Sequence, residues 1–93
     1  MKKKVVILGS TGSIGCNALQ VIDALSSEYE VIALSAHRNV DLLAEQVKNF
    51  SPRYAAVTDE QSAAVSSKQF SGFSGRLLAG PESLVEFPSS RFV

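Results

Sequence analysis

The sequence has a single cysteine and no excess of charge of either sign. One cysteine excludes an internal disulfide. Nine basic and nine acidic side chains cancel, so the chain lacks the broad basic surface that nucleic acids need, and no nucleic-acid partner is expected. Apolar residues nevertheless make up 45% of the chain, which favours a packed globular domain over a disordered one.

Long hydrophobic runs are also absent. No stretch approaches the ~20 apolar residues of a membrane span, so no membrane association is expected. Only four apolar residues separate the lysines at 2–4 from Gly9, too few for the roughly 7–15 of a signal peptide. The lysines are then a solvated terminus, and a cytoplasmic location is expected.

The chain does contain a glycine-rich run, GSTGSIG at residues 9–15, between apolar residues 5–8 and a segment with helical periodicity. A strand, a glycine turn and a helix in this order place unpaired helix amides, at the positive end of the helix dipole, where a phosphate can bind. Gly9 would allow a tight reversal and Gly12 the approach of a pyrophosphate. Gly15 would allow the helix to pack close to the sheet.

Polar residues of the same run add to this prediction. Ser10, Thr11 and Ser13 would supply hydroxyl donors to phosphate oxygens. The spacing is GxxGxxG rather than GxGxxG, so a structural turn without a ligand is the alternative. No Lys-Ser or Lys-Thr follows the glycines, which excludes a P-loop. Cys16 is either a small residue packed behind the turn or a thiol made reactive by the helix N-terminus.

Apolar periodicity predicts alternating strands and helices. The expected elements are a strand at 5–8, a helix at 13–25 with the stripe Ile14, Ala18, Leu19, Ile22 and Leu25, a strand at 31–34, a helix at 40–50 capped by Asn39, a strand at 54–57 and a weak helix reaching residue 65, capped at Thr58 or Asp59. This order predicts an α/β fold: a Rossmann-like, doubly wound parallel sheet with helices on both faces and ligands at the carboxyl ends of its strands. Beyond residue 66 we expect only an edge strand at 76–79 and a short helix at 83–87, begun by Pro81 and ended at 88–90.

The residues that follow the second strand, SAHRN at 35–39, contain no acid. Chains that bind NAD usually place a carboxylate about 20 residues after the glycines, to hold the ribose 2′-hydroxyl. Arg38 can instead bind a 2′-phosphate through charge-assisted hydrogen bonds. The serine and asparagine of this run could add neutral hydrogen bonds, and His37 could stack on adenine or contact phosphate. The pattern favours NADP(H) over NAD(H), with an exposed basic loop that binds nothing as the alternative.

Three blocks of the sequence resemble the 1-deoxy-D-xylulose 5-phosphate reductoisomerase family. They are LGSTGSIG at 8–15, VIALSA at 31–36 followed by RNV at 38–40, and FSPRYA at 50–55 followed by DE at 59–60. The resemblance covers most of residues 4–60. It implies an NADPH-dependent enzyme of the non-mevalonate isoprenoid pathway, which uses Mg²⁺ or Mn²⁺. Such enzymes rearrange 1-deoxy-D-xylulose 5-phosphate to an aldehyde and reduce that to 2-C-methyl-D-erythritol 4-phosphate.

The resemblance also implies cofactor-binding residues. Those expected at the cofactor phosphates are Thr11, Gly12, Ser13 and Ile14, and those expected around the 2′-phosphate are His37, Arg38 and Asn39. Family members often have a small residue where His37 stands, so this position could contribute through its side chain or only its backbone.

The family's enzymes are several times longer than this chain, and their metal ligands and substrate site lie beyond residue 93. We therefore expect residues 1–93 to be the N-terminal part of an NADPH-binding domain, without catalytic residues, metal ligands or a C-terminal domain. The strand that would flank the first strand beyond the cofactor crevice is also expected to be missing, which would leave an unpaired apolar edge prone to association. The family further implies a homodimer.

Two alternatives remain open at this point. One is another NADP-dependent oxidoreductase with a GxTGxxG turn, such as an aspartate-semialdehyde dehydrogenase or an extended short-chain reductase. A nucleophilic cysteine or a Tyr-x-x-x-Lys pair after residue 93 would identify it. The other is a dinucleotide-sensing module without chemistry of its own.

Overall fold

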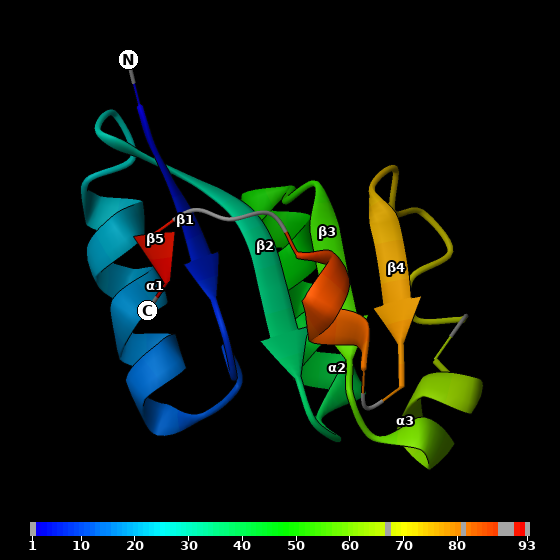
Figure 1. Ribbon diagram of the computed structural model, residues 1–93. Coiled ribbons are helices and arrows are strands. Elements are labelled where there is room, and N and C mark those ends of the chain that lie inside the picture. Colours follow the sequence, from blue (N-terminus) through cyan, green and yellow to red (C-terminus); the bar gives the residue numbers. More distant parts are fainter. Residues whose placement is uncertain (1, 67, 81, 88–90, 93) are drawn as a thin grey trace.

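The computed structural model describes residues 2–66, 68–80, 82–87 and 91–92. They form one parallel sheet of five strands in the order β4-β3-β2-β1-β5. The elements along the chain are β1 (Lys3–Ile7), α1 (Ser13–Ala24), β2 (Tyr29–Ala36), α2 (Val40–Phe50), β3 (Tyr54–Val57), α3 (Glu60–Ala64), β4 (Arg76–Ala79), the 3₁₀ helix η1 (Ser83–Glu86) and β5 (Arg91–Phe92). This arrangement confirms the predicted α/β fold class, and β4 is an edge strand as expected (Figure 1).

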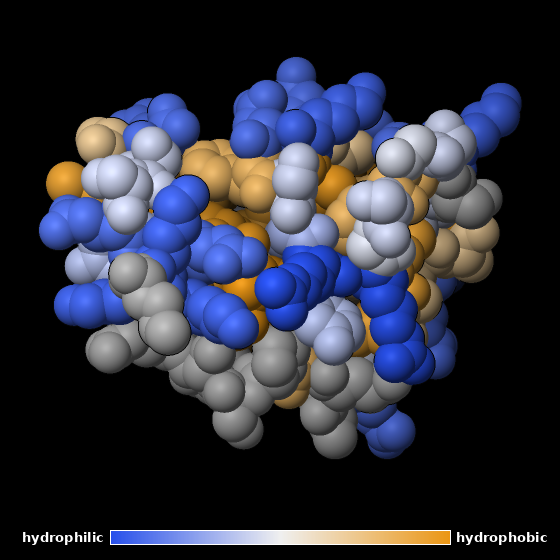
Figure 2. All heavy atoms as spheres, turned by 90° about the horizontal axis from the view of Figure 1, so that it is seen from above, coloured by the Kyte–Doolittle hydropathy of each residue, from blue (hydrophilic) through white to orange (hydrophobic). Residues whose placement is uncertain are grey.

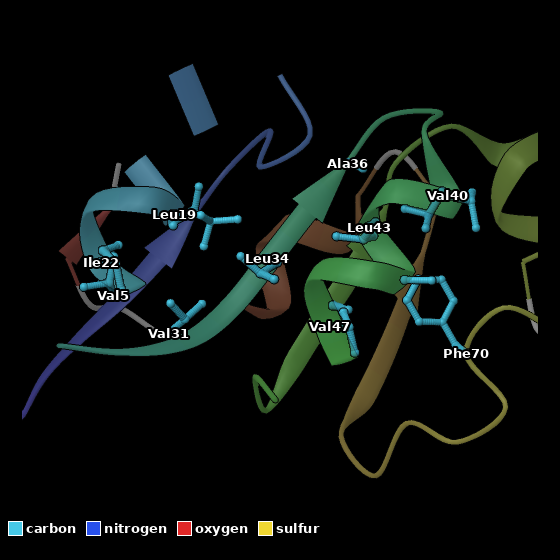
Figure 3. Close-up of a cluster of buried hydrophobic side chains, with 14 residues drawn as sticks. Val5, Leu19, Ile22, Val31, Leu34, Ala36, Val40, Leu43, Val47 and Phe70 are labelled. Carbon is cyan, nitrogen blue, oxygen red and sulfur yellow. The ribbon is translucent and has the colours of Figure 1, made fainter. Parts of the chain in front are cut away.

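Helices α1 and α2 cover the same face of the sheet, where the larger core lies (Figure 3). Two successive right-handed crossovers in the same direction place both helices on that face. The residues of this core that Figure 3 labels are Val5, Leu19, Ile22, Val31, Leu34, Ala36, Val40, Leu43, Val47 and Phe70. Each fully buried Val, Leu or Phe side chain contributes roughly 1.5–3 kcal/mol to folding. This core therefore fixes the position of the end of β1 relative to the end of β2.

The opposite face carries a smaller apolar cluster under η1, which crosses in front of β3 in Figure 1. The register between β1 and β2 shifts there, from Val5 opposite Val31 to Val6 opposite Ala33. Ile32 is the extra residue, and both Ile32 and Ala33 join this cluster. Helices were expected on both faces, but in the described part of the chain this face is covered by η1 rather than by an α-helix.

Strand β5 corrects one prediction. It pairs in parallel with β1, Val5 opposite Arg91 and Val6 opposite Phe92. The expectation that no strand flanks β1 on this side was therefore wrong. A two-residue strand has no apolar periodicity that the sequence could reveal, and its partner lies more than 80 residues earlier in the chain. Pro81 and residues 88–90, expected to begin and end the last helix, lie outside the described residues.

The apolar stripe expected on α1 is also corrected. Ile14 is 81% exposed and Leu25 is 39% exposed. The buried positions of α1 are instead Gly15, Leu19 and Ile22. The line that faces the sheet thus begins at a glycine, which brings the helix axis close to the turn before it and leaves Ile14 outside the core.

Figure 2 shows the end of the molecule from which the chain starts, opposite the carboxyl ends of the strands. Hydrophilic side chains cover much of this end, with hydrophobic ones visible between them. Within the described ranges, no helix has the length and apolar character needed to cross a membrane.

Candidate functional site

The carboxyl ends of the strands meet at one edge of the sheet, together with the β1–α1 turn and α3 (Figure 1). The chain adds β2, β3 and β4 on one side of β1, and then β5 on the other side. In open parallel sheets such a reversal of strand order marks the crevice where ligands bind. The glycine-rich run follows β1 directly and so lies at this crevice.

The three glycines of the run differ in what the fold requires of them. Gly9 has a φ of 68°, in the left-handed region, which confirms the predicted tight reversal. A Cβ on Gly15 would lie 2.6 Å from the Cα of Ser10 and would also meet the Gly9 carbonyl oxygen, so the expected close packing is confirmed. A Cβ on Gly12 would stand at an ordinary 3.4 Å from that oxygen. The fold itself therefore tolerates a side chain at position 12. Because Gly12 has no side chain, the space outside the turn at this position stays open.

Helix α1 begins differently from the other helices. Asn39 caps α2 and Asp59 caps α3, each accepting a hydrogen bond from an amide three residues further on, at 3.3 Å and 3.0 Å. Of the three α-helices in the described chain, only α1 starts without a side-chain cap, at Gly12, and its first turn contains no acid. The amides of Ser13 and Ile14 have no acceptor within the helix. They lie at the positive end of its dipole, where an anion would be stabilised.

Two serines expected to bind phosphate or ribose instead hold the turn in place. Ser10 is fully buried, and its hydroxyl donates to Oε1 of Gln46 at 2.7 Å. Ser35 is 3% exposed, and its Oγ accepts from the Gly9 amide at 2.9 Å. The expectation that both would contact a ligand was therefore wrong, because each hydroxyl is used inside the protein.

Cys16 lies behind the turn. Its Sγ is 3.5 Å from the Ser10 carbonyl oxygen and 3.8 Å from Nε2 of Gln46, and the residue is half-buried. These contacts agree with the interpretation of Cys16 as a small packing residue.

The basic residues after β2 face the end of β3. Arg38 is 75% exposed, and its Nε lies 3.6 Å from Oδ1 of Asp59. His37 has Nδ1 2.8 Å from the Thr58 hydroxyl and Nε2 4.0 Å from the same Asp59 oxygen. An open hollow is lined by His37, Arg38, Thr58, Asp59, Glu60, Gln61 and Leu84. It combines the exposed guanidinium group of Arg38 with two acids, Asp59 and Glu60, of which Asp59 faces Arg38 and His37.

Asp59 also lines this hollow, although the sequence pattern indicated it only as a helix cap. Hydrogen bonds from the hydroxyl and the amide of Ser62, at 2.8 Å and 3.0 Å, lower the pKa of its carboxyl group, and Arg38 adds to this effect. The carboxylate is ionised at neutral pH. An anion held by Arg38 would therefore compete with Asp59 for the guanidinium group.

The structure brings the predicted cofactor residues to one edge in two groups. They are Thr11, Gly12, Ser13 and Ile14 at the start of α1, and His37, Arg38 and Asn39 after β2. The link between the groups is Ser35, which accepts from the amides of both Gly9 and Ser10. The side-chain oxygen of Asn39, Oδ1, accepts a hydrogen bond from the Leu42 amide of α2. The side-chain nitrogen, Nδ2, is left as a donor.

No metal centre accompanies these residues. Within residues 2–66, 68–80, 82–87 and 91–92, no three His, Cys, Asp or Glu side chains gather in a way that could hold a metal ion. The acids and the histidine near Arg38 therefore do not fit a divalent cation.

Known proteins resemble this chain in sequence. The family model of 1-deoxy-D-xylulose 5-phosphate reductoisomerase matches residues 5–92. The enzyme of that name from Halothermothrix orenii is 40% identical over 89 residues, which are 96% of this chain and 23% of the relative. The one from Moorella thermoacetica is 46% identical over 85 residues, or 91% of this chain and 22% of the relative. The chain thus spans less than a quarter of the length of either relative.

Solved structures of the same enzyme share the fold. The Zymomonas mobilis enzyme in complex with NADPH superposes with a TM-score of 0.86 at 36% identity, over 92% of this chain and 23% of that one. A reductoisomerase in complex with NADPH, fosmidomycin and magnesium gives 0.83 at 30% identity, over 90% and 21%. Together with the family match over nearly the whole chain, these likenesses show that the chain belongs to the 1-deoxy-D-xylulose 5-phosphate reductoisomerase family.

Proposed function

We propose that this chain binds the adenosine end and the phosphates of NADPH. Thr11, Gly12, Ser13 and Ile14 bind the pyrophosphate, and His37, Arg38 and Asn39 surround the 2′-phosphate. The chain would thus be the N-terminal part of the NADPH-binding domain of its protein. The protein as a whole would rearrange 1-deoxy-D-xylulose 5-phosphate to an aldehyde and reduce it to 2-C-methyl-D-erythritol 4-phosphate.

The uncapped start of α1 carries this proposal. Its first amides and the positive end of its dipole suit the two negative charges of a pyrophosphate. The absence of a side chain at Gly12 allows those oxygens to approach the backbone. The packing around Gly12 does not itself require a glycine there. The tight hydrogen bonds of Ser35 to the turn place Arg38, three residues further on, at the same edge.

Arg38 would select the phosphorylated cofactor. Its exposed guanidinium group can donate to a 2′-phosphate through two parallel hydrogen bonds. When bound, NADPH supplies the hydride for the reduction. This chain's residues bind and orient the cofactor at its far end, and none of those described is assigned to the chemistry at the substrate.

Titration calorimetry on the complete gene product tests the selectivity. We expect NADPH to bind more tightly than NADH. Arg38→Ala should cost about 1.5–3 kcal/mol in NADPH binding, a loss of about 10- to 150-fold in affinity, and should leave NADH binding nearly unchanged.

Arg53→Ala is the matched control. Arg53 is similarly exposed and its Nη2 lies 3.9 Å from an oxygen of Glu30, but it precedes β3 and so belongs to the opposite edge of the sheet. Its removal should leave both affinities unchanged. Equal affinity of the wild-type protein for NADPH and NADH, or an Arg38→Ala variant with unaltered NADPH binding, would refute the 2′-phosphate assignment.

Three finer expectations belong to the same proposal. A cytoplasmic location would be tested by fractionating cells that produce a tagged copy. The homodimer implied by the family would be tested by sedimentation of the complete gene product. Dependence of the reaction on Mg²⁺ or Mn²⁺ would be tested by chelation and readdition, since solved family structures contain magnesium.

A further inference from the structure

One buried polar side chain is not explained by the core. Gln46 lies on the sheet-facing side of α2 and is only 6% exposed. Burial of a primary amide is unfavourable unless its donors and acceptor are paired. Its neighbours on the buried side, Leu43 and Val47, are apolar, so an apolar residue of similar size would suit the packing alone.

The amide of Gln46 is paired almost entirely with one residue of the turn. Its Nε2 donates to the Ser10 carbonyl oxygen at 2.8 Å, and its Oε1 accepts from the Ser10 hydroxyl at 2.7 Å. The same Nε2 lies 3.8 Å from Sγ of Cys16. Gln46 thus forms hydrogen bonds with both the main chain and the side chain of Ser10, within the glycine-rich run.

Ser10 is in turn tied to β2. Its amide donates to the Ser35 carbonyl oxygen at 2.7 Å, and its hydroxyl lies 3.2 Å from that same oxygen. The turn is therefore fixed from two directions, by the end of β2 and by the second turn of α2. Gly9 and Gly12 have no side chains and are held through their amides, which donate to Ser35 Oγ at 2.9 Å and to the Gly9 carbonyl oxygen at 3.0 Å. Ser10 is thus the residue of the run through which α2 acts on the turn.

We infer that Gln46 is a positioning residue for the phosphate-binding turn. It touches no ligand and acts through Ser10, which it holds so that the first amides of α1 point together at the crevice. The inference rests on the proposed binding of NADPH phosphates at that turn. It assigns α2 a function besides core packing, because the same helix that starts beside Arg38 also supports the pyrophosphate subsite.

Gln46→Glu tests this inference, because its two protonation states differ in one hydrogen bond. A protonated glutamate can donate to the Ser10 carbonyl and accept from the Ser10 hydroxyl, as glutamine does. An ionised glutamate only accepts, and would face the carbonyl oxygen. Burial raises a carboxyl pKa above the ~4.3 of an exposed glutamate, so both states should be reached at pH values where the protein is folded.

We expect NADPH to bind Gln46→Glu nearly as tightly as wild type at low pH, and about tenfold more weakly once the new carboxyl is ionised. Gln20→Glu is the matched control, because Gln20 is an exposed glutamine of α1, and it should follow the wild-type pH profile. The affinity for 2′-AMP, which reports only the Arg38 subsite, should not change in Gln46→Glu.

Hydrogen exchange without ligand distinguishes a failure of the positioning function from a failure of the proposed NADPH binding. Ionised Gln46→Glu should speed exchange at the amides of residues 12–14 while those of β3 stay protected. Unchanged exchange and an NADPH affinity that follows the wild-type pH profile would overturn the positioning function. Faster exchange at the turn in a protein whose wild-type form does not bind NADPH would instead refute the proposed function. Faster exchange throughout the sheet would show that Gln46 supports the core alone, and would also overturn the inference.

Discussion

Replacement of Gly15 by alanine should damage the fold, although alanine is the better helix former. A Cβ at this position would lie 2.6 Å from the Cα and 2.9 Å from the carbonyl carbon of Ser10, and would also meet the Gly9 carbonyl oxygen. All three are backbone atoms, so no side-chain rotation can relieve the contact. Either α1 or the turn must move.

The sign of the effect depends on two opposing contributions. Alanine in place of glycine favours a helix by up to about 1 kcal/mol. Overpacking against a fixed neighbour costs typically 1–3 kcal/mol, and a contact with backbone belongs near the upper end of that range. We expect Gly15→Ala to lose about 1–2 kcal/mol in free energy of unfolding, measured by urea denaturation of the complete gene product.

Gly12→Ala is the discriminating partner of this variant. Its Cβ would meet the protein only at an ordinary 3.4 Å, and the residue has a φ of −78° that alanine adopts readily. Stability should therefore change by no more than about 0.5 kcal/mol. NADPH affinity should fall about tenfold or more, since the new methyl group would occupy the approach of the pyrophosphate. The reasoning is refuted if Gly15→Ala is as stable as wild type, or if Gly12→Ala binds NADPH normally.

Three further predictions follow from other positions. Ser51, the C-cap of α2, has a φ of 47° and a ψ of 53°; Ser51→Gly should raise the free energy of unfolding by about 0.5–1 kcal/mol, because glycine adopts this left-handed conformation without strain, and a lower urea midpoint would contradict this. Asp59 has a lowered pKa, so its stabilising contribution is present above its ordinary pKa of 3.8 and is lost as the pH falls through the folded pKa. In an acid titration followed by circular dichroism, the stability of Asp59→Asn, which keeps an acceptor for the cap, should depend less on pH than that of the wild type. Identical titration curves would count against a lowered pKa of Asp59. The 93-residue chain alone should self-associate, because Ile14 and Val21 on α1 are 81% and 59% exposed; a sharp monomeric sedimentation peak with a cooperative thermal transition would disprove it.

Local signals in the sequence predicted most of the fold. The apolar runs and the 3.6-residue periodicity placed β1 to β4 and the helices between them, and Asn39 caps α2 as its position before Val40 indicated. These features depend on neighbours in the chain. Strand β5 could not be predicted in this way, since its two residues are held only by pairing with a strand far away in the sequence.

The site was predicted by residue type, and burial separates residues that the sequence alone does not distinguish. Ser10 and Ser13 look alike in the sequence, but Ser10 is fully buried and Ser13 is exposed. Ile14 fitted a core stripe by spacing, yet the close approach at Gly15 turns the buried side of α1 away from it. One signal for Gln46 was present: a polar residue three positions after Leu43, on the otherwise apolar face of an amphipathic helix.

The pairing of β5 with β1 has a consequence for synthesis of the protein on the ribosome. Residues 3–80 contain both walls of the proposed phosphate subsites, built from consecutive units that contact their neighbours in the chain. These units can assemble as they emerge. Until residues 91–92 follow, the apolar strand β1 is an open edge, to which the nascent chain of a neighbouring ribosome could add a strand. The interval between completion of β4 and arrival of β5 is thus a window of misassembly, and slow translation of the segment between them would lengthen it.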